Sequence, residues 1–276
     1  MPYQKFSEIP KLLKDLSDPP KELYYLAKED SGAAQNDIMD IFDNCVAVVG
    51  SRRMTDYGRR VLDKLIPQLV FEKKTIVSGF MYGTDQYAHQ TCVDNGGKTI
   101  AVLGWGIDKK LFDYDKKLAE QIINSGGLLI SEWETQEGAL WTFPSRNRIV
   151  AALAKEVFVI EAAEKSGSLI TANMAIKLKR KVWAVPGPIT SKTSVGTNNL
   201  ISERKARMWI GKNQQQKLIT DNPILSVLEN ESLSTDELAR KVGRSVVEIG
   251  AELSILLLSG KVMERGGKYY IEENAD

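Results

Sequence analysis

Six short apolar runs, separated by segments with helical spacing, constrain the fold of this chain more than any other feature of its sequence. The runs are rich in valine and isoleucine, which is typical of strands buried on both faces of a parallel sheet. They occupy residues 45–49, 75–77, 99–103, 128–130, 157–160 and 182–185. Helical patterns follow at residues 57–71, 84–95, 113–124, 145–154 and 168–178. This alternation predicts an α/β fold with an extended Rossmann-type parallel sheet and helices on both faces.

Four of the predicted strands end in glycine-containing turns. In open parallel sheets, ligands bind beyond the carboxyl ends of the strands. We therefore expect a site on the rim formed by Gly50-Ser51-Arg52, Ser78-Gly79, Gly104-Trp105-Gly106 and Pro186-Gly187. The order of the strands in the sheet cannot be read from the sequence.

The chain divides by composition into four parts. Residues 1–43 carry four prolines and form a lead-in segment without a core of its own, and residues 44–211 form the Rossmann-type domain. Apolar periodicity is weak from residue 189 to 216, and a polar linker is expected at 212–220. Residues 221–276 predict three helices and a β-hairpin turning at Gly266-Gly267, which together describe a winged helix. Two capping boxes, Ser234 with Glu237 and Ser245 with Glu248, mark the starts of its second and third helices.

The net charge of +1 hides an asymmetry between these parts. Residues 221–276 hold 6 Lys/Arg and 11 Asp/Glu, whereas the first 220 residues hold 31 and 25. The larger part is therefore the better candidate for a polyanionic partner. The predicted recognition helix at 246–258 has no Lys or Arg, so duplex phosphates should repel it. We expect this module to bind protein or to pack against it, and not to bind DNA.

Cysteine and histidine are scarce. Cys45, Cys92 and the single His89 cannot form a structural zinc site without several carboxylates, so no metal and no cofactor is expected. Cys45 lies in an apolar run and is predicted to be buried, and a disulfide is not expected. The sequence lacks an apolar stretch of about 18 to 20 residues and a signal peptide, which favours a soluble cytoplasmic protein.

The turn Gly50-Ser51-Arg52 is the first candidate binding element. A helix is predicted to begin soon after it, near Asp56, and outward-pointing N–H groups in such a turn favour an anion. Arg52 adds a planar, charged fork suited to phosphate. The sequence has neither the glycine pattern of a dinucleotide site nor that of a P-loop. The alternative is an ordinary strand-to-helix turn with a solvated arginine.

Phe143, Arg146, Asn147 and Arg148 form the second candidate. Aromatic faces beside arginines hold unstacked bases and their backbone in many single-strand binders. Pro144 and Ser145 predict a helix start there, with two arginines in its first turn opposing the helix dipole unless an anion binds. The alternative is a helix start with Phe143 in the core. A weaker third candidate is the segment 166–171, where Ser168 could cap a helix beside Thr171.

A catalytic set is not recognisable. His89 is alone on a predicted helix and reads as a structural residue, while Asp85 and Glu161 lie near strand ends without pairing as acid and base. A nucleotide-processing enzyme of the phosphoribohydrolase kind would need a Pro-Gly-Gly-x-Gly-Thr loop with a following Glu. The loop at 166–171 reads Ser-Gly-Ser-Leu-Ile-Thr and lacks both features. An interaction adaptor without nucleic-acid affinity is a further alternative.

The ordered motifs resemble the DNA-processing protein A family, also called DprA or Smf. The resemblance runs from about residue 10 to 210 and rests on segments 49–52, 78–85, 99–104, 143–149, 160–162, 166–172, 184–187 and 196–201. The family's second motif usually has Ala and Ile where Met81 and Thr84 stand, which puts the packing near Asp85 in question. Many members also carry an N-terminal helical domain, of which only a trailing segment is seen, so its functions are not carried over.

The resemblance implies an extended Rossmann sheet that binds single-stranded DNA with little sequence preference and is not an enzyme. It also implies a homodimer that helps load the RecA recombinase during natural transformation. The family's phosphate-binding turn falls on Gly50, Ser51 and Arg52, and its aromatic stacking position falls on Phe143. The predicted DNA-binding residues are therefore Gly50, Ser51, Arg52, Ser78, Gly79, Phe143, Arg146, Asn147, Arg148, Ser168 and Thr171.

Overall fold

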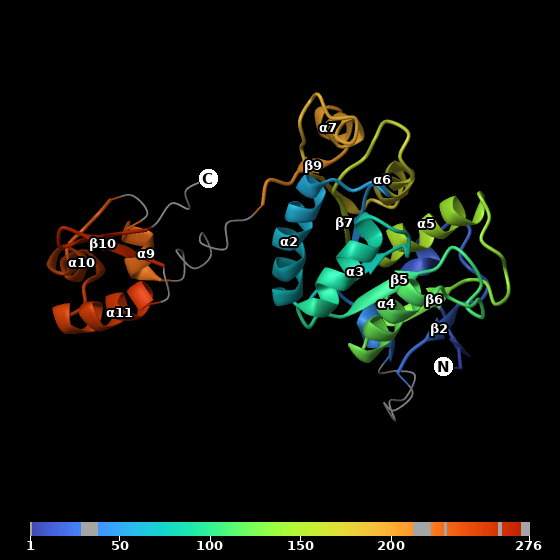
Figure 1. The fold of residues 1–276 in the computed structure, drawn as a ribbon, viewed down its shortest axis with the longest axis horizontal. Coiled ribbons are helices and arrows are strands. Elements are labelled where there is room, and N and C mark those ends of the chain that lie inside the picture. The colour runs from blue at the N-terminus through green and yellow to red at the C-terminus, as the bar shows by residue number, and fades with distance from the viewer. Residues whose placement is uncertain (1, 29–37, 212–221, 229–230, 259–260, 272–276) are drawn as a thin grey trace. The chain divides into compact units, whose positions relative to one another are not determined.

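A computed structural model describes residues 2–28, 38–211, 222–228, 231–258 and 261–271 (Figure 1). The chain separates into two compact units, Met1–Gly211 and Lys212–Asp276. The predicted linker at 212–220 lies outside the described residues. Within the described part of the chain, the helices are too short or too polar to cross a membrane.

The first unit is built on a sheet in the order β1-β2-β6-β5-β4-β3-β7-β8-β9. The strands from β3 to β9 are parallel, and β1 and β2 are antiparallel at one edge. Their bounds are β1 Gln4–Lys5, β2 Tyr24–Leu26, β3 Cys45–Val49, β4 Thr75–Ser78, β5 Thr99–Val102, β6 Leu128–Ser131, β7 Glu156–Val159, β8 Lys181–Ala184 and β9 Arg207–Met208. The six predicted strands and the mostly parallel sheet are confirmed.

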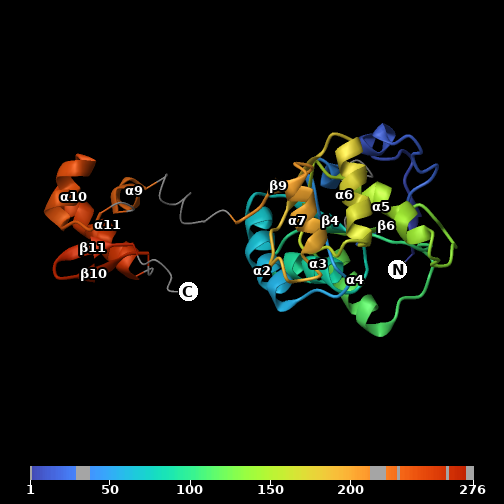
Figure 2. The ribbon, with the colours of Figure 1, turned by 90° about the horizontal axis from the view of Figure 1, so that it is seen from above.

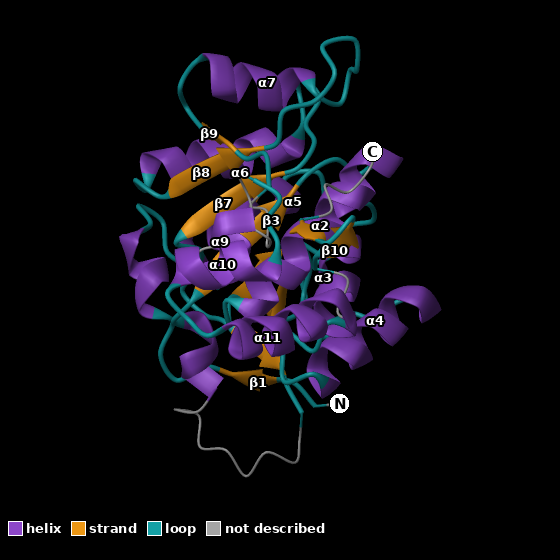
Figure 3. Ribbon diagram, turned by 90° about the vertical axis from the view of Figure 1, so that its left-hand side faces the viewer, coloured by secondary structure: helices purple, strands orange, loops and turns teal. Residues whose placement is uncertain are grey.

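Alternating side chains of β3 explain why helices cover both faces of the sheet. All five of its residues are buried. Val46 and Val48 pack with α2 Asp56–Phe71 and α3 Thr84–Asp94, while Cys45, Ala47 and Val49 pack with α5 Thr142–Leu153 and α6 Gly167–Lys177. Figure 2 shows these two helical layers with strands between them, and Figure 3 shows β3, β7, β8 and β9 side by side. Helix α4 Asp113–Asn124 extends the first layer, and α7 Val195–Ser202 adds Leu200 to the second.

Strand β3 is the point where the direction of sheet building reverses. The chain runs outward from β3 through β4 and β5 to β6, then crosses back so that β7 pairs with the other side of β3. A crevice opens beyond the carboxyl ends of the strands where such a reversal occurs, and ligands bind there in open α/β sheets. This topology places the turns after β3, β4 and β7 next to one another.

Several expected details differ from the structure. Helix α5 begins at Thr142, so Ser145 lies inside its first turn and is not the N-cap. Pro144 fits there because the first-turn N–H groups have no partner within the helix. Ser166, not Ser168, caps α6 through a side chain that accepts the Ser168 N–H. The short strands β1, β2 and β9 and the helix α7 were not predicted.

The lead-in residues take part in the sheet of the first unit. Tyr24, Tyr25 and Leu26 of β2 pair with β6, and β1 pairs in turn with β2. A 3-10 helix, Lys11–Asp15, buries Leu13 in the same core. A second 3-10 helix, Asp40–Phe42, leads into β3 and buries Phe42. The lead-in thus contributes to this core.

The second unit contains α9 Pro223–Leu228, α10 Thr235–Val242, α11 Val246–Leu258 and the hairpin of β10 Met263–Arg265 with β11 Lys268–Tyr270. Both predicted capping boxes form, at Ser234 with Glu237 and at Ser245 with Glu248. The hairpin turns at Gly266 and Gly267, both with positive φ. These are the predicted three helices and hairpin, and the winged-helix assignment stays a prediction.

Both cysteines are free and buried, as predicted for Cys45. Burial raises the pKa of each thiol to about 12, so neither is a ready thiolate. Among the residues that the structure describes, His, Cys, Asp and Glu side chains do not gather in threes that could hold a metal ion.

Candidate nucleic-acid interface

A cleft of about 480 Å³ lies at the carboxyl ends of β3, β4 and β7. It brings together nine of the eleven predicted site residues. These are Gly50, Ser51, Arg52, Gly79, Phe143, Arg146, Asn147, Ser168 and Thr171. The cleft therefore lies where the reversal of strand order predicts a site.

A larger hollow of about 680 Å³ lies at the opposite edge of the sheet. Lysines and glycine turns line it, but it contains none of the predicted site residues. The smaller cleft is the better candidate because it has both the predicted residues and the topological position.

The turn at Gly50 is held against the start of α3. A Cβ on Gly50 would lie 2.5 Å from Thr84 Oγ1, so only glycine fits without a shift. The Thr84 hydroxyl and N–H both donate to the Ser51 carbonyl at 3.1 Å. Gly83 has a φ of +88°, and a Cβ there would lie 2.5 Å from the same carbonyl. Thr84, which departs from the usual family residue, thus supplies a hydrogen bond that orients the turn.

Arg52 and Phe143 lie together over the cleft. The Arg52 guanidinium carbon is 5.5 Å from the Phe143 ring centroid, which is within cation–π range. Arg52 is exposed, and its charge faces no carboxylate at ion-pair distance among the described side chains. The half-buried Phe143 ring packs edge-on against Trp105 at 6.3 Å, and the missing Cβ of Gly104 leaves room for it. An aromatic ring and an unpaired cation thus lie side by side.

Arg146 lies beneath this pair and is almost fully buried, with 3% of its surface exposed. Its Nη1 donates to the Val102 carbonyl at the end of β5, and its Nε donates to Asn147 Oδ1 at 3.2 Å. A Cβ on Gly79 would lie 2.4 Å from Asp85 Oδ2 and 2.5 Å from Arg146 Nη2. Glycine at this position therefore lets the guanidinium and the Asp85 carboxylate close over the β4 turn.

Burial shapes the charges of this pair. Burial lowers the pKa of Arg146 to about 10, although the nearby Asp85 carboxylate favours its charged form. Burial also raises the pKa of Asp85, while the nearby Arg146 guanidinium opposes that rise. Arg146 is thus a supporting cation in the floor of the cleft.

His89 supports the β4 turn from below and is completely buried. Its Nε2 lies 2.6 Å from the Gly79 carbonyl, and its Nδ1 lies 2.7 Å from Thr99 Oγ1. A carbonyl can only accept, so Nε2 carries the proton. In the neutral ring Nδ1 is an acceptor that faces the Thr99 hydroxyl, whose single proton is shared with the Ile76 carbonyl at 2.9 Å. Burial lowers the pKa of His89 to about 4. The ring holds the Gly79 carbonyl and does not reach the cleft.

Two predicted site residues lie outside the cleft lining. Ser78 is buried, and its hydroxyl donates to the Val48 carbonyl at 2.5 Å. Arg148 makes a two-pronged ion pair with Glu132, with N···O distances of 2.6 and 2.9 Å. The two side chains are only 13% and 10% exposed. Because α5 begins at Thr142, the two arginines lie beyond its first turn, and the predicted dipole argument does not apply.

The structure adds Arg53, Lys192 and Thr193 to the cleft lining. Lys192 and Thr193 belong to the loop after β8, where the sequence shows little periodicity. Glu161, at the end of β7, holds this loop by accepting from the Thr193 hydroxyl at 3.1 Å. In the sequence, Glu161 is visible only as a glutamate that follows a strand. That position does not reveal that it holds the loop containing Lys192 and Thr193.

Glu161 also occupies the N-terminus of α2. It accepts the Thr55 N–H at 2.9 Å and the Thr55 hydroxyl at 2.6 Å. The helix start near Asp56, which the sequence assigned to a bound anion, therefore already has a carboxylate of the protein. The positive charge at the cleft comes instead from the exposed side chains of Arg52, Arg53 and Lys192.

The arrangement suits a flexible polyanion. Across the part of the chain that the structure describes, none of these three cations has an ion-pair partner. The small residues Gly167 and Ser168 at the start of α6 lie across the cleft, where a strand's backbone could approach closely. Cations that follow a backbone beside an aromatic platform are the usual means of holding single-stranded nucleic acid.

Sequence comparison relates this chain to proteins of known families. A profile of the family described as DNA recombination-mediator protein A matches residues 3–220. Protein Smf of Synechocystis sp. is 37% identical over 219 residues, which cover 79% of this chain and 53% of that protein. DNA processing protein DprA of Streptococcus pneumoniae is 44% identical over 159 residues, which cover 57% of this chain and 56% of that protein. The chain thus spans about half the length of these relatives.

Solved structures agree with these matches. DNA processing protein A from Streptococcus pneumoniae has a TM-score of 0.66 and 36% identity, covering 76% of this chain and 71% of its own. DNA processing protein A from Helicobacter pylori, described for its single-stranded DNA binding mode, also has a TM-score of 0.66, with 29% identity. That comparison covers 79% of this chain and 96% of the other. The chain belongs to the DNA recombination-mediator protein A family.

Proposed function

We propose that the cleft binds single-stranded DNA without strong sequence preference, and that the protein acts as a recombination mediator. The observation that carries the proposal is the Arg52–Phe143 pair at the sheet's reversal point. Its cation lies 5.5 Å from the aromatic ring and has no ion-pair partner among the described side chains. Arg52 would bind a phosphate while Phe143 stacks on the adjacent base. A ring presented in this way favours a single strand, because the bases of a duplex are already stacked.

The proposed contacts read the backbone and the faces of bases. The phosphates would be bound by the side chains of Arg52, Arg53 and Lys192. Arg146, in the floor of the cleft, makes its hydrogen bonds within the protein. Every base has a face on which an aromatic ring can stack, so this mode tolerates sequence. We propose a structural role for Ser78 and Arg148, whose side chains bind within the protein.

A binding protein fits this cleft better than the phosphoribohydrolase alternative. His89, Asp85 and Glu161 are the candidate acid–base groups in or beneath the cleft, and each interacts with structural partners. The segment 166–171 is not followed by the glutamate that the enzyme chemistry needs. Incubation with AMP should therefore release no adenine, and release above the level of a heat-treated sample would favour the enzyme.

Membership of the family supports two further parts of this proposal. One is a homodimer, and the other is an interaction with the RecA recombinase that loads it onto the bound strand during DNA uptake. Sedimentation of the full chain would show the dimer, which a single sedimenting species of about 31 kDa would contradict. RecA should form filaments faster on strands that carry this protein than on strands that do not.

Two substitutions test the cleft itself. Arg52→Ala should weaken binding of a labelled oligothymidine by about 1.5–3 kcal/mol, and Phe143→Leu, which keeps an apolar side chain, by about 1–3 kcal/mol. Arg60→Ala and Phe71→Ala, at exposed positions on α2 outside the cleft, are matched controls that should leave affinity unchanged. Fluorescence anisotropy measures each affinity. Wild-type affinity in both cleft variants, with the fold intact, would show that the site lies elsewhere.

A further inference from the structure

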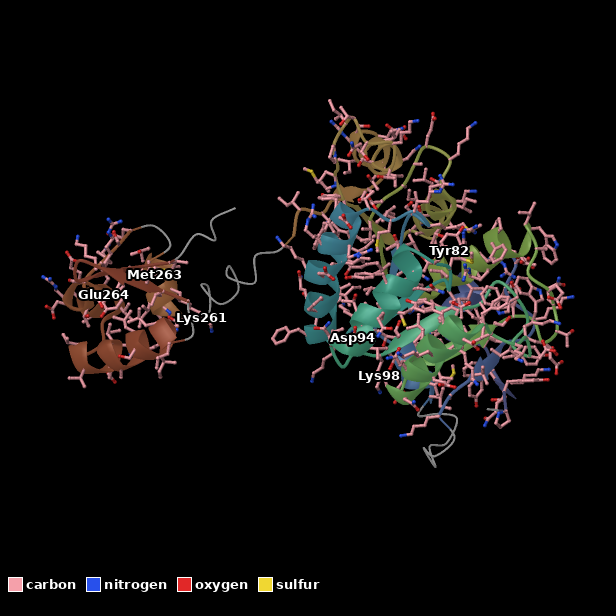
Figure 4. All side chains as sticks on the ribbon, in the orientation of Figure 1. Tyr82, Asp94, Lys98, Lys261, Met263 and Glu264 are labelled. Carbon is pink, nitrogen blue, oxygen red and sulfur yellow. The ribbon has the colours of Figure 1, made fainter. Side chains whose placement is uncertain are left out.

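Four large aromatic side chains are exposed on the same edge of the first unit as the cleft. We call this group the aromatic rim, and its exposed fractions are 58% for Tyr82, 84% for Phe112, 68% for Tyr114 and 57% for Trp141. Tyr82 follows β4, Phe112 and Tyr114 follow β5, and Trp141 follows β6, so all four lie beyond carboxyl ends of strands. Figure 4 shows Tyr82 apart from Asp94 and Lys98, which follow at the other end of α3.

Hydrogen bonds join the loops that carry the rim. The Gly106 and Ile107 N–H groups, in the loop after β5, donate to the carbonyls of Gln136 and Trp133 at 2.7 and 2.9 Å. Lys109 forms an ion pair with Glu137 at 2.7 Å across the same two loops. These contacts hold the segment before Phe112 against the segment before Trp141.

The remaining link joins the starts of α3 and α4. Gln86 Nε2 donates to Asp115 Oδ1 at 2.7 Å, which ties the helix that follows Tyr82 to the helix that contains Tyr114. Three neighbouring loops of the rim are thus fixed to one another, and the aromatic side chains project from a connected surface.

This surface is continuous with the cleft. Tyr82 follows Met81, which lines the cleft. Trp141 lies two residues before Phe143, whose ring packs against Trp105 in the loop after β5. A strand that leaves Phe143 toward β4 and β5 would therefore meet the rim next.

The charge of the rim differs from that of the cleft. Residues 104–117 hold four lysines and three aspartates, and the loop before Trp141 adds Glu132, Glu134 and Glu137. Glu137 pairs with Lys109 and Glu132 pairs with Arg148. The cleft, in contrast, has three cations without carboxylate partners in the described chain. A nearly neutral aromatic surface suits the faces of bases better than it suits phosphates.

We propose that the aromatic rim is a second, stacking-dominated segment of the strand-binding path, which holds the bases next to those in the cleft. The inference rests on the proposed function of the cleft and extends it. Large exposed apolar groups that gather on one edge commonly mark a contact surface. Their continuity with the cleft favours a nucleic-acid strand as the occupant over a protein partner.

An oligonucleotide that carries bases on only part of its backbone tests this proposal. A core of about 6 thymidines, within the about 4 to 16 nucleotides that such sites occupy, is extended on its 5′ or 3′ side. The extension carries either thymines or abasic sugars, so its phosphates are unchanged. On one side, wild-type protein should bind the thymine extension about fivefold more tightly than the abasic one, and this ratio should vary little with salt.

The double variant Tyr82→Ala/Phe112→Ala should bind the core as the wild type does but distinguish the two extensions by less than about twofold. Phe71→Ala, exposed on α2, is the aromatic control and should keep the wild-type ratio. If the double variant keeps the wild-type ratio of affinities for the two extensions, the proposal for the rim is wrong, while the proposed function of the cleft still stands. If the sedimentation coefficient of the double variant has also changed, the rim is a protein contact instead. Failure of every protein to bind the core overturns the proposed function and the rim with it.

Discussion

The buried His89 under the cleft should make the stability of the first unit depend on pH, by an amount that follows from its lowered pKa. Burial lowers the pKa of His89 from 6.5 to about 4. Below pH 6.5 the unfolded chain takes up a proton that the folded ring refuses, so stability is full near pH 7.5 and falls as the pH drops toward 4. Linkage gives a loss of about 2 kcal/mol between pH 7.5 and pH 5, and about 3 kcal/mol by pH 4.

Denaturant unfolding of wild type and His89→Gln at pH 7.5 and pH 5 measures this loss. The five tryptophans all lie in the first unit, so their fluorescence reports its unfolding alone. The glutamine amide can still donate to the Gly79 carbonyl but does not titrate. Asp85 and the other carboxyls are common to both proteins and cancel in the difference. Equal losses of stability in the two proteins would refute the neutral, buried histidine.

Two further predictions separate structural from binding residues. Arg148→Met should destabilise the first unit by about 3 kcal/mol, because Glu132 would be left buried without its partner, while oligothymidine affinity stays within about twofold of wild type. An affinity loss as large as that of Arg52→Ala would return Arg148 to the binding set. A chain ending at Gly211 should bind oligothymidine as tightly as the full chain, since the second unit is acidic, and a clear loss would show that this unit contacts the strand.

The sequence predicted those parts of the fold whose signal is local. Apolar runs in the sequence mark the six buried strands. Helix α4 was predicted at the residues where it occurs, because amphipathic spacing and glycine stops are local features. Strands β1, β2 and β9 escaped prediction because they are two or three residues long and depend on pairing with neighbours far along the chain.

The candidate site was predictable in its turns but not in its partners. Gly50 and Gly79 signalled close approach of the backbone, and the structure puts both in the cleft. Whether Arg148 would point into the cleft or toward Glu132 depends on the placement of the loop after β6. The same applies to Lys192, because only the strand order shows that the loop after β8 reaches the cleft. Such long-range placements are absent from periodicity and spacing.

The most direct test of the account is the salt dependence of oligothymidine binding by wild type and Arg52→Ala, measured side by side. Three cleft cations without carboxylate partners in the described chain predict that the logarithm of affinity falls with the logarithm of salt with a slope of about −2. Arg52→Ala should make that slope shallower by about 0.7, the contribution of one phosphate contact on a single strand. An unchanged slope in the variant, or no binding by wild type at low salt, would contradict the account.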